Sequence, residues 1–554
     1  MTTPVDLVWL GPAGEVPAWA RGSVVVAKPT PSDVAKALDG ILGSRDRAPW
    51  ILFWAPASGR VPDTESLQRL LDRPGDVWHA GLALGMGGLP RLIDFVAPTW
   101  MLNRNPDVAI EATSWRLSLG ACLVRTDALR QLGGLRAEFS SMAGAALELG
   151  HRLVTRGAFV RHVPALLEPG TPSSSGPVTL PLEDELRFVA LRFGRRWARW
   201  ALTRVVLSGT VGAAEAVRAT RRLADLRVSQ PLPTYRRTES GGERASRAVR
   251  VTVLVPTVDR YPYLLTLLEQ LRKQTRPPHE VIVVDQTSRE QRITDLESRF
   301  PGLPLRVLTM DQAGQCSSRN AGLQAATGDY ILFLDDDDEI PAELIERHVT
   351  NLGRFRCEVS SGVAEEVGAG PLPEAFTFVR TSDVFPTNNT LVDREVLVRS
   401  GLFDLAFDHG PRADHDLGMR TYLSGALMVL DPAISVLHHH APQGGLRKHG
   451  ARVVTYASSR SRLTHRALPS ATEMYLERRY FMPRQVREAF WISVLGSFSL
   501  RGGGLRRILK VFMSTLLLPD TLRTLRARAH ASKQMLSEFP RIPSFSRDRT
   551  TREY

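Results

Sequence analysis

A regular alternation of short apolar runs and amphipathic segments, which begins at residue 251, restricts the fold more than any other feature of the chain. The apolar runs are typical of buried strands, and we expect strands at 251–255, 280–285, 305–310 and 330–334. Strands that alternate with helices form a mostly parallel sheet. Ligands of such sheets bind at the carboxyl ends of the strands. The sequence therefore predicts an α/β domain whose site lies at that edge.

Acidic side chains follow two of these strands. Asp285 ends the second strand, and the fourth is followed directly by the run Asp335, Asp336, Asp337 and Asp338. Adjacent carboxylates repel one another and lose hydration beside a buried strand, so a divalent cation that neutralises them is one explanation. A solvated acidic turn before a helix is the other, because acids favour a helix N-terminus. A calcium loop between two helices fits poorly, since Ile340 stands where that loop needs glycine.

The first third of the chain repeats the end of this domain in altered form. When residues 123–165 are placed against 391–433, thirteen positions are identical. Composition alone would give about three. The run at 50–54 likewise resembles 330–334, but the four aspartates are replaced by Ala55, Pro56, Ala57 and Ser58. We therefore expect two α/β domains, of which the first has lost the acidic site.

A segment of basic and helical character follows each α/β domain. A linker rich in Ser, Pro and Gly ends the first domain, and a polar connector precedes the second. The expected division is an α/β domain at 1–170, a helical segment and linker at 171–249, a second α/β domain at 250–465 and a basic amphipathic helical region at 466–554.

The charge distribution points to an anionic partner of the C-terminal region. The formal net charge is +13, and residues 484–554 contribute +9 of it, with 14 Lys or Arg against 5 Asp or Glu. Basic side chains alternate there with apolar and aromatic ones, as in helices that lie at a membrane interface. We favour an anionic lipid surface over nucleic acid. A terminal helical lobe with a solvated basic face is the alternative.

Cysteine usage and hydropathy bear on the location of the protein. The three cysteines, Cys122, Cys316 and Cys357, have neither the number nor the spacing of a disulfide framework or a zinc site, which favours a reducing compartment. No stretch reaches the roughly 18 apolar residues of a spanning helix. We expect a cytoplasmic protein, either in solution or bound to the inner face of the cell membrane.

A set of motifs between residues 253 and 442 resembles one enzyme family. In chain order they are VLVPTVDRYPYLLTLLEQL, VIVVDQTS, GQCSSRNAGLQAATGDYILFLDDDD, NNTLVDREVLVRSGLFD, ADHDLG and VLHHHAP. Their order and spacing resemble the family 2 glycosyltransferases. The resemblance implies a GT-A fold with a Rossmann-like, mixed or parallel sheet, and a degenerate GT-A-like copy at the N-terminus. It also implies an inverting transfer of a sugar from a nucleotide-sugar to an acceptor hydroxyl, assisted by Mg or Mn.

The resemblance further implies that the donor is held by Pro256, Thr257, Asp285, Asp335 and Asp336. Arg319 and Asn320 are further candidates for binding the donor, with helix packing or capping as the alternative. A carboxylate at a strand end can accept hydrogen bonds from an imide N–H or from ribose hydroxyls. Gln286 replaces a second acid that many relatives have, so the nucleotide is not specified. A structural role is the alternative, because Thr287 and Glu290 have the spacing of a capping box for a helix that Asp285 would precede.

The Asp-x-Asp motif of the family falls on Asp335 and Asp337, and the resemblance adds His438 and His440 as ligands of the metal or contacts of the diphosphate. Carboxylate oxygens suit Mg or Mn, and the ion would neutralise the charge that grows on the departing diphosphate. A histidine-rich surface loop is the alternative. The turn that follows carries Arg447 and Lys448, which either close over the diphosphate or form a plain basic loop.

The catalytic base implied by the resemblance is Asp414, since Ala413 replaces the acid before it and Asp416 is expected to orient Arg420. We therefore expect a glycosyltransferase that acts in the synthesis of a cell-surface glycan or a lipid-linked saccharide. The alternative is a non-catalytic protein that binds nucleotide-sugars or assembles other proteins. A dinucleotide enzyme or a P-loop protein is not supported, because neither glycine motif occurs in the required context.

Overall fold

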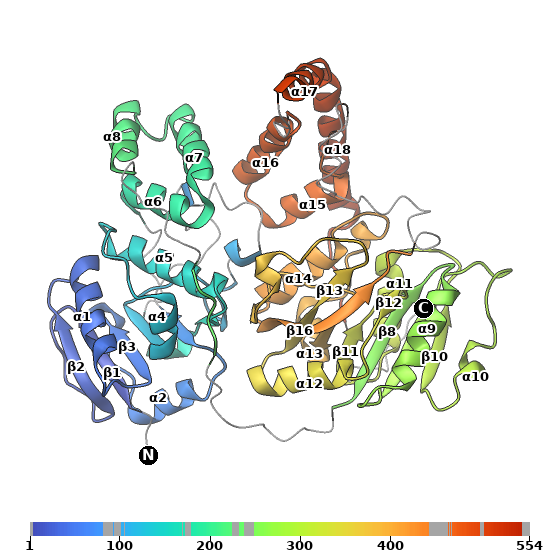
Figure 1. Ribbon diagram of the computed structural model, residues 1–554, viewed down its shortest axis with the longest axis horizontal. Coiled ribbons are helices and arrows are strands. Elements are labelled where there is room, and N and C mark those ends of the chain that lie inside the picture. Colours follow the sequence, from blue (N-terminus) through green and yellow to red (C-terminus); the bar gives the residue numbers. More distant parts are fainter. Residues whose placement is uncertain are drawn as a thin grey trace.

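The computed structural model describes residues 4–80, 92–93, 101–104, 106–168, 170–171, 179–223, 232–237, 249–441, 464, 466, 468–498 and 504–545. They form two α/β domains that lie side by side, and a group of helices projects from each of them (Figure 1). Among the described residues, no helix combines the length and the apolar character that crossing a lipid bilayer requires. The three cysteines are buried and free.

The first domain is built on a seven-stranded mixed sheet of order β2-β1-β3-β6-β4-β7-β5. Its strands are β1 (Val5–Leu10), β2 (Ala20–Val26), β3 (Trp50–Trp54), β4 (Val77–Ala80), β5 (Ala112–Thr113), β6 (Ala121–Arg125) and β7 (Val160–His162). Its helices include α1 (Pro31–Gly43), α2 (Thr64–Leu71), α4 (Thr126–Leu132) and α5 (Met142–Thr155).

The second domain contains a nine-stranded sheet of order β10-β9-β8-β11-β15-β13-β16-β12, with β14 paired to β16. Its strands are β8 (Val251–Thr257), β9 (Glu280–Asp285), β10 (Leu305–Thr309), β11 (Tyr330–Phe333), β12 (Asp338–Glu339), β13 (Val359–Glu366), β14 (Arg380–Thr381), β15 (Thr390–Asp393) and β16 (Met428–His438). Its helices are α9 (Tyr261–Arg272), α10 (Leu296–Arg299), α11 (Gln315–Ala325), α12 (Leu344–Phe355), α13 (Arg394–Ser400) and α14 (Ala413–Leu423).

The four strands predicted from the sequence are adjacent in this sheet and run parallel, in the order β10-β9-β8-β11. Strands β8, β9 and β11 form because continuous Val, Ile and Leu runs are buried on both faces of the sheet, whereas β10 is a partly exposed edge strand. The predicted helix after Thr287 is wrong. Thr287 instead accepts a hydrogen bond from the Asp259 backbone N–H, and only the short helix α10 forms further on.

The two domains share one strand order. The sheet β2-β1-β3-β6-β4-β7-β5 corresponds, strand by strand and direction by direction, to β9-β8-β11-β15-β13-β16-β14. The helices α4 and α5 correspond in the same way to α13 and α14. The start of β5 at Ala112 and the start of β14 at Arg380 are separated by the same 268 positions as the sequence repeat.

The interface between the domains is reciprocal. Helix α5 contacts β14, and the corresponding α14 contacts β5. Gly157 approaches the carbonyl oxygen of Val379, and Gly425 approaches that of Glu111. In the repeat, Gly157 corresponds to Gly425 and Glu111 corresponds to Val379, so the two contacts are equivalent. An interface in which residue i meets j while the equivalent of j meets the equivalent of i is isologous. Here that arrangement occurs within a single chain.

We expect Gly425→Ala to lower the free energy of unfolding by at least about 1–2 kcal/mol, because Gly425 has a φ of +86° that L residues rarely adopt. A methyl group there would also lie 2.4 Å from the Glu111 carbonyl oxygen in the other domain. The measurement is the thermal midpoint of unfolding. Gly370→Ala is the matched control, since nothing lies within 4 Å of its added carbon. Equal midpoints for the two variants would contradict a close-packed interface.

Helices α6 (Leu182–Phe193), α7 (Arg195–Leu207) and α8 (Ala213–Leu223) follow the first sheet, and α15 (Ala471–Tyr480), α16 (Pro483–Gly496), α17 (Gly504–Leu516) and α18 (Leu518–Glu538) follow the second. Helix α15 is fixed to the second domain by two buried tyrosines. The Tyr480 hydroxyl donates to Asp416 at 2.6 Å, and the Tyr475 hydroxyl donates to Asp404 at 2.6 Å. After α18 the chain returns to the second sheet, where Leu402 N–H donates to the Pro543 carbonyl at 2.8 Å.

Candidate active site

The acidic run lies at the carboxyl edge of the second sheet, as predicted. Strand β11 ends at Phe333, and the chain turns through Asp335 to Asp337 into the short strand β12. Strand β12 pairs antiparallel with the end of β16, so that Asp338 lies opposite His438. This pairing brings a histidine from a distant part of the chain to the acidic run.

Asp335, Asp337 and His438 form a group of potential metal ligands. One ligand atom of each lies within 4.8 Å of those of the others. The Nδ1 atom of His438 is 2.9 Å from Asp338 Oδ1 and 3.7 Å from Asp337 Oδ1. The structure therefore joins three of the four predicted metal residues in one place.

His440 lies outside this group. Its Nε2 atom is 3.1 Å from Glu366 Oε1, and its ring packs edge-on against that of His438. Strand β16 ends at His438, and His440 has a φ of +50°, so the extended backbone that positions His438 does not continue to His440. The prediction for Arg447 and Lys448 concerns positions beyond the described residues.

The carboxylate of Asp337 is buried but only partly satisfied. Its Oδ2 accepts a hydrogen bond from the Ala441 backbone N–H at 2.8 Å. Its Oδ1 is buried and accepts no hydrogen bond from the residues that the structure describes, although Arg260 Nη1 lies 3.2 Å away. Burial alone would raise the pKa of Asp337, but the charges of His438 and Arg260 outweigh it and hold the pKa below its usual value. The result is an ionised carboxylate with one oxygen available.

The neighbouring Asp336 and Asp338 are engaged by the protein itself. Asp336 accepts hydrogen bonds from Thr257 Oγ1 at 2.7 Å and from Arg260 Nη1 at 3.0 Å, and burial raises its pKa to about 7. Burial also raises the pKa of Asp338, against the effect of His438. For His438, burial favours the neutral ring, but the hydrogen bond to Asp338 and the surrounding carboxylates outweigh it and raise the pKa. Asp336 thus ties the acidic run to β8.

Two of the residues predicted to hold the nucleotide-sugar donor, Asp285 and Asn320, form hydrogen bonds within the protein. Asp285 is fully buried and accepts hydrogen bonds from the Tyr261 hydroxyl at 2.6 Å and from Thr287 N–H at 2.9 Å. Asn320 donates to the Phe403 carbonyl at 2.9 Å and accepts from the Phe403 N–H at 2.8 Å. The amide of Asn320 therefore fixes the loop that leads to α14.

The other predicted donor residues remain next to the acidic run. Arg319 donates to Asp335 Oδ1 at 2.8 Å and is otherwise buried in α11. Pro256 and Thr257 lie at the end of β8, and the Thr257 carbonyl accepts from Gln286 N–H at 3.0 Å. Thr257 and Arg319 thus contact the acidic run directly, at Asp336 and Asp335.

Asp414 lies in the first turn of α14, and its side chain is 39% exposed. His415 Nδ1 is 2.9 Å from its Oδ1, and Arg412 Nη1 is 3.0 Å from His415 Nε2. Arg412 in turn donates to Glu473 of α15 at 2.9 Å. Burial raises the pKa of the Asp414 carboxyl, but His415 and Arg412 lower it more, to about 2. Asp414 is therefore ionised and lies at the end of a chain of polar contacts that runs through His415 and Arg412 to Glu473.

Asp416 has a structural partner, as the sequence suggested. It pairs with Arg420 at 2.7 Å, and Arg420 also donates to the Ser400 carbonyl. The corresponding pair of the first domain is Glu148 and Arg152, at 3.1 Å. Both pairs hold the helix against the end of the preceding one.

Sequence reasoning did not single out Arg260, Tyr261, His415 or Arg412. The first two follow β8 directly and could have been found from that position alone, because the predicted site lies at the strand ends. The role of Arg412 depends on Glu473, which is 61 positions away, and no local pattern signals that contact.

Similarity to known proteins covers the part of the chain that contains the acidic run. The family described as glycosyl transferase family 2 matches residues 252–382. An uncharacterised glycosyltransferase, YwdF, of Bacillus subtilis is 32% identical over 100 residues, which cover 18% of this chain and 37% of the relative. The poly(ribitol-phosphate) β-N-acetylglucosaminyltransferase TarS of Staphylococcus aureus is 27% identical over 191 residues, which cover 32% and 33%. The chain spans about a third of the length of these curated relatives.

Among solved structures, residues 1–349 of S. aureus TarS with UDP-GlcNAc match at 19% identity, with a TM-score of 0.34, over 52% of this chain and 91% of that one. The mannosyltransferase PcManGT of Pyrobaculum calidifontis, with GDP-Man and Mn²⁺, matches at 17% identity with a TM-score of 0.34, over 63% and 98%.

Proposed function

We propose that this chain, whose residues 252–382 form a family 2 glycosyltransferase domain, transfers a sugar from a nucleotide-sugar to an acceptor hydroxyl with inversion. The observation that carries the proposal is the group of Asp335, Asp337 and His438 at the carboxyl edge of the sheet. Phosphate groups bound at that edge need positive charge nearby, and Arg260 and Arg319 supply part of it.

The residues of this group fit Mg²⁺ or Mn²⁺. Within the described part of the chain, the buried Oδ1 of Asp337 accepts no hydrogen bond, and two carboxylates with one imidazole are a set of ligands that Mn²⁺ accepts. Asp335, Asp337 and His438 would hold the ion. When bound, it would stabilise the charge on the departing diphosphate. Asp338 would orient His438, whose Nδ1 it already contacts.

In this proposal Asp414 takes the proton of the acceptor hydroxyl as the sugar is transferred. Direct displacement needs no covalent intermediate with the enzyme, but it needs a base on the acceptor side. Asp414 is ionised and partly exposed, and both properties favour a role as the base that takes this proton. The other donor contacts would come from Pro256, Thr257 and Asp285, with the nucleotide laid over the ends of β8 and β9.

The acceptor is proposed from the relatives. Three of them are named poly(ribitol-phosphate) β-N-acetylglucosaminyltransferase, amylovoran biosynthesis glycosyltransferase and chondroitin synthase. We extend to this chain the class of acceptor only, which is a growing glycan or its lipid-linked precursor. The first domain would then be a copy that has lost the acidic run, and that supports the second through the reciprocal interface.

We expect a nucleoside diphosphate together with Mn²⁺ to raise the apparent unfolding temperature of the chain by a few degrees, while neither does so alone, because ligands that bind only the folded state stabilise it. The measurement is a thermal-shift screen of UDP, GDP and dTDP. Asp337→Asn should abolish the shift. A shift that persists in this variant would place nucleotide binding elsewhere, for example in the first domain.

The C-terminal helices are proposed to hold the enzyme at an anionic membrane surface. Helix α17, at the tip of its group in Figure 1, exposes its apolar side chains and buries polar ones. It buries Lys510 and Ser514, whereas its large apolar side chains are exposed: Leu505 71%, Ile508 66%, Leu509 41%, Phe512 58% and Leu516 58%. A helix in water normally buries its apolar stripe. Because α17 carries three basic residues and no acidic one, anionic lipid is the surface that suits it.

We expect Ile508→Glu to weaken binding to anionic vesicles by at least about tenfold, since burial of one such side chain contributes roughly 1.5–3 kcal/mol. The measurement is sedimentation with phosphatidylglycerol vesicles. The control is Leu207→Glu, at an apolar side chain of α7 that is 82% exposed. If Ile508→Glu changed the oligomeric state and left vesicle binding intact, the stripe would contact a second copy of the chain instead.

A further inference from the structure

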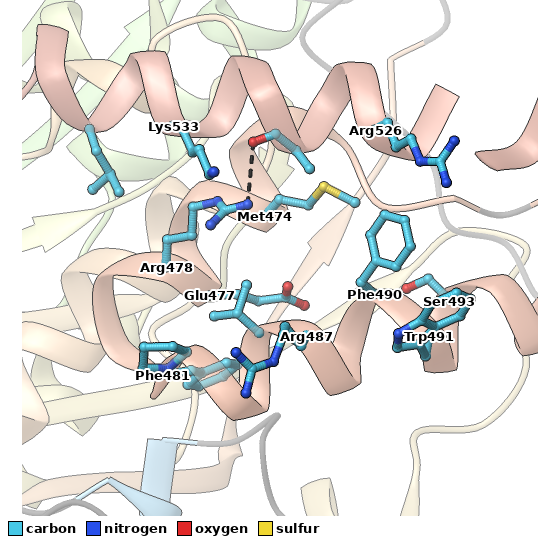
Figure 2. A pocket seen from close by; sticks show the side chains of 14 residues that line it. Met474, Glu477, Arg478, Phe481, Arg487, Phe490, Trp491, Ser493, Arg526 and Lys533 are labelled. Carbon is cyan, nitrogen blue, oxygen red and sulfur yellow. Dashed lines mark hydrogen bonds between the residues drawn. The ribbon is translucent and has the colours of Figure 1, made fainter. Parts of the chain in front are cut away.

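A cavity of about 540 Å³ lies between helices α15, α16 and α18 (Figure 2). Its volume falls within the roughly 300–1,000 Å³ typical of small-molecule sites. Apolar side chains from all three helices line it: Met474, Phe481, Val486, Phe490 and Leu536. It is separate from the group of Asp335, Asp337 and His438, and nothing in the proposed transfer reaction uses it.

Cationic side chains surround the same cavity. Arg487 comes from α16, and Arg526 and Lys533 come from α18 (Figure 2). All three are exposed, and none of them has an ion pair or a side-chain hydrogen bond within the part of the chain that the structure describes. The fourth cation, Arg478, is already held, because it donates to Ser532 Oγ at 2.7 Å and to the Ala529 carbonyl at 3.3 Å. Three cations that have no anionic partner among the described residues thus lie around an apolar cavity.

We propose that this cavity binds the hydrocarbon chain of a phosphate-bearing lipid, with its head group at the rim formed by Arg487, Arg526 and Lys533. Apolar walls favour a hydrocarbon, and unpaired cations at their edge favour a phosphate over a neutral head group. The exposed stripe of α17 adjoins the same helical group, so a lipid can enter from a membrane. A free phosphate ion would leave the apolar walls without a partner.

The inference deepens the proposed function and rests on it, because a lipid in this cavity is suited to carry the acceptor. Helix α15 lines the cavity through Met474 and Glu477, and the same helix holds Arg412 through Glu473. Arg412 contacts His415, which contacts Asp414. Helix α15 therefore lines the lipid site and is also connected, through Glu473, Arg412 and His415, to the proposed base on α14.

Glu477 adds a dependence on pH. Burial and the charge of Glu473 raise its pKa to about 7, against the effect of Arg478. The other charged groups that line the cavity are Arg478 on α15, Arg487 on α16, and Arg526 and Lys533 on α18, while Glu473 on α15 acts on Glu477 without lining the cavity. Below pH 7 Glu477 is mostly neutral and repels an anion less, so an anionic ligand is bound more tightly at pH 6 than at pH 8.

The test uses the full chain and decyl phosphate below its micelle concentration, with affinity measured by calorimetry. We expect binding of decyl phosphate, at least tenfold weaker binding of decyl maltoside, and no binding of inorganic phosphate at the same concentration. Arg526→Ala should weaken decyl phosphate binding by about tenfold, as expected for one charge-assisted contact. Arg523→Ala is the matched control, since it is exposed on the same helix and does not line the cavity.

Several outcomes would overturn the inference. They are equal affinity for decyl maltoside and decyl phosphate, binding of inorganic phosphate alone, or equal effects of Arg526→Ala and Arg523→Ala. Decyl sulfate, whose charge does not change with pH, should bind the parent more tightly at pH 6 than at pH 8. This difference should disappear in Glu477→Gln. An affinity of the parent that does not depend on pH would also contradict the inference. Asp337→Asn should leave decyl phosphate binding unchanged, which separates this inference from the transfer reaction. Ile508→Glu should likewise leave it unchanged.

Discussion

Asp337→Asn is expected to lower sugar transfer by about 10³-fold or more at saturating Mn²⁺, which corresponds to roughly 4 kcal/mol of transition-state stabilisation. Asparagine has nearly the same shape but removes the negative charge from the buried oxygen that accepts no hydrogen bond in this structure. The metal would then be held by Asp335 and His438 alone. The measurement is kcat/KM from release of the nucleoside diphosphate, in the presence of the acceptor.

The control for this experiment is Asp311→Asn in the same domain. Asp311 is 55% exposed and pairs with the exposed Arg289, and surface pairs of this kind contribute little. We expect its kcat/KM to stay within about twofold of the parent. If Asp337→Asn kept more than a tenth of the parent activity while the chain stayed folded by circular dichroism, the assignment of this group to the metal would be wrong.

Much of the second domain could be predicted because its central strands carry their own signal. Strands β8, β9 and β11 are continuous apolar runs that are buried on both faces, so neither partner nor register is needed to recognise them. The position of the acidic run at the edge of the sheet followed from the direction of β11. The comparisons agree with the family that these motifs indicated.

The roles of the individual aspartates could not be predicted in the same way. In the sequence Asp335, Asp336, Asp337 and Asp338 are equivalent, and only the turn between β11 and β12 gives each of them a different direction. Asp336 contacts Thr257 at the end of β8. Asp338 contacts His438 because β12 pairs with β16, which lies 100 positions further along the chain. Contacts of this range are set by the tertiary fold and leave no local pattern.

The repeat shows a similar limit. The identities at a constant offset of 268 predicted two related domains, and the two sheets have corresponding strand orders. They did not predict that Gly157 and Gly425 would meet Val379 and Glu111 across a reciprocal interface. Both glycines have a positive φ and a carbonyl oxygen close by, which explains why each position excludes a side chain. The sequence shows glycine at both equivalent positions, and the structure shows that the close carbonyl oxygens and the positive φ require it.

Asp414→Asn is expected to lower the transfer rate by about 10²–10⁴-fold, the range that general base catalysis contributes. Binding of the nucleoside diphosphate with Mn²⁺ should not change, because Asp414 is not in the group of Asp335, Asp337 and His438. The measurement is single-turnover transfer, with the thermal shift as the readout of binding. Asp295→Asn, at an exposed surface pair with Arg299, is the control. Loss of nucleotide binding together with activity would contradict a role on the acceptor side.

The pKa of Asp414, about 2, makes a further test possible. If Asp414 is the base, so low a pKa favours a proton transfer that follows the start of bond formation between the acceptor oxygen and the sugar, when the hydroxyl has become more acidic. A carboxyl with a depressed pKa is ionised above that pKa, and the parent activity should show no loss from this group between pH 4 and pH 8. His415→Gln removes the neighbour whose charge and hydrogen bond lower the pKa most, so the acidic limb of kcat should move upward in pH. An unchanged limb in a folded variant would mean that another group takes the proton.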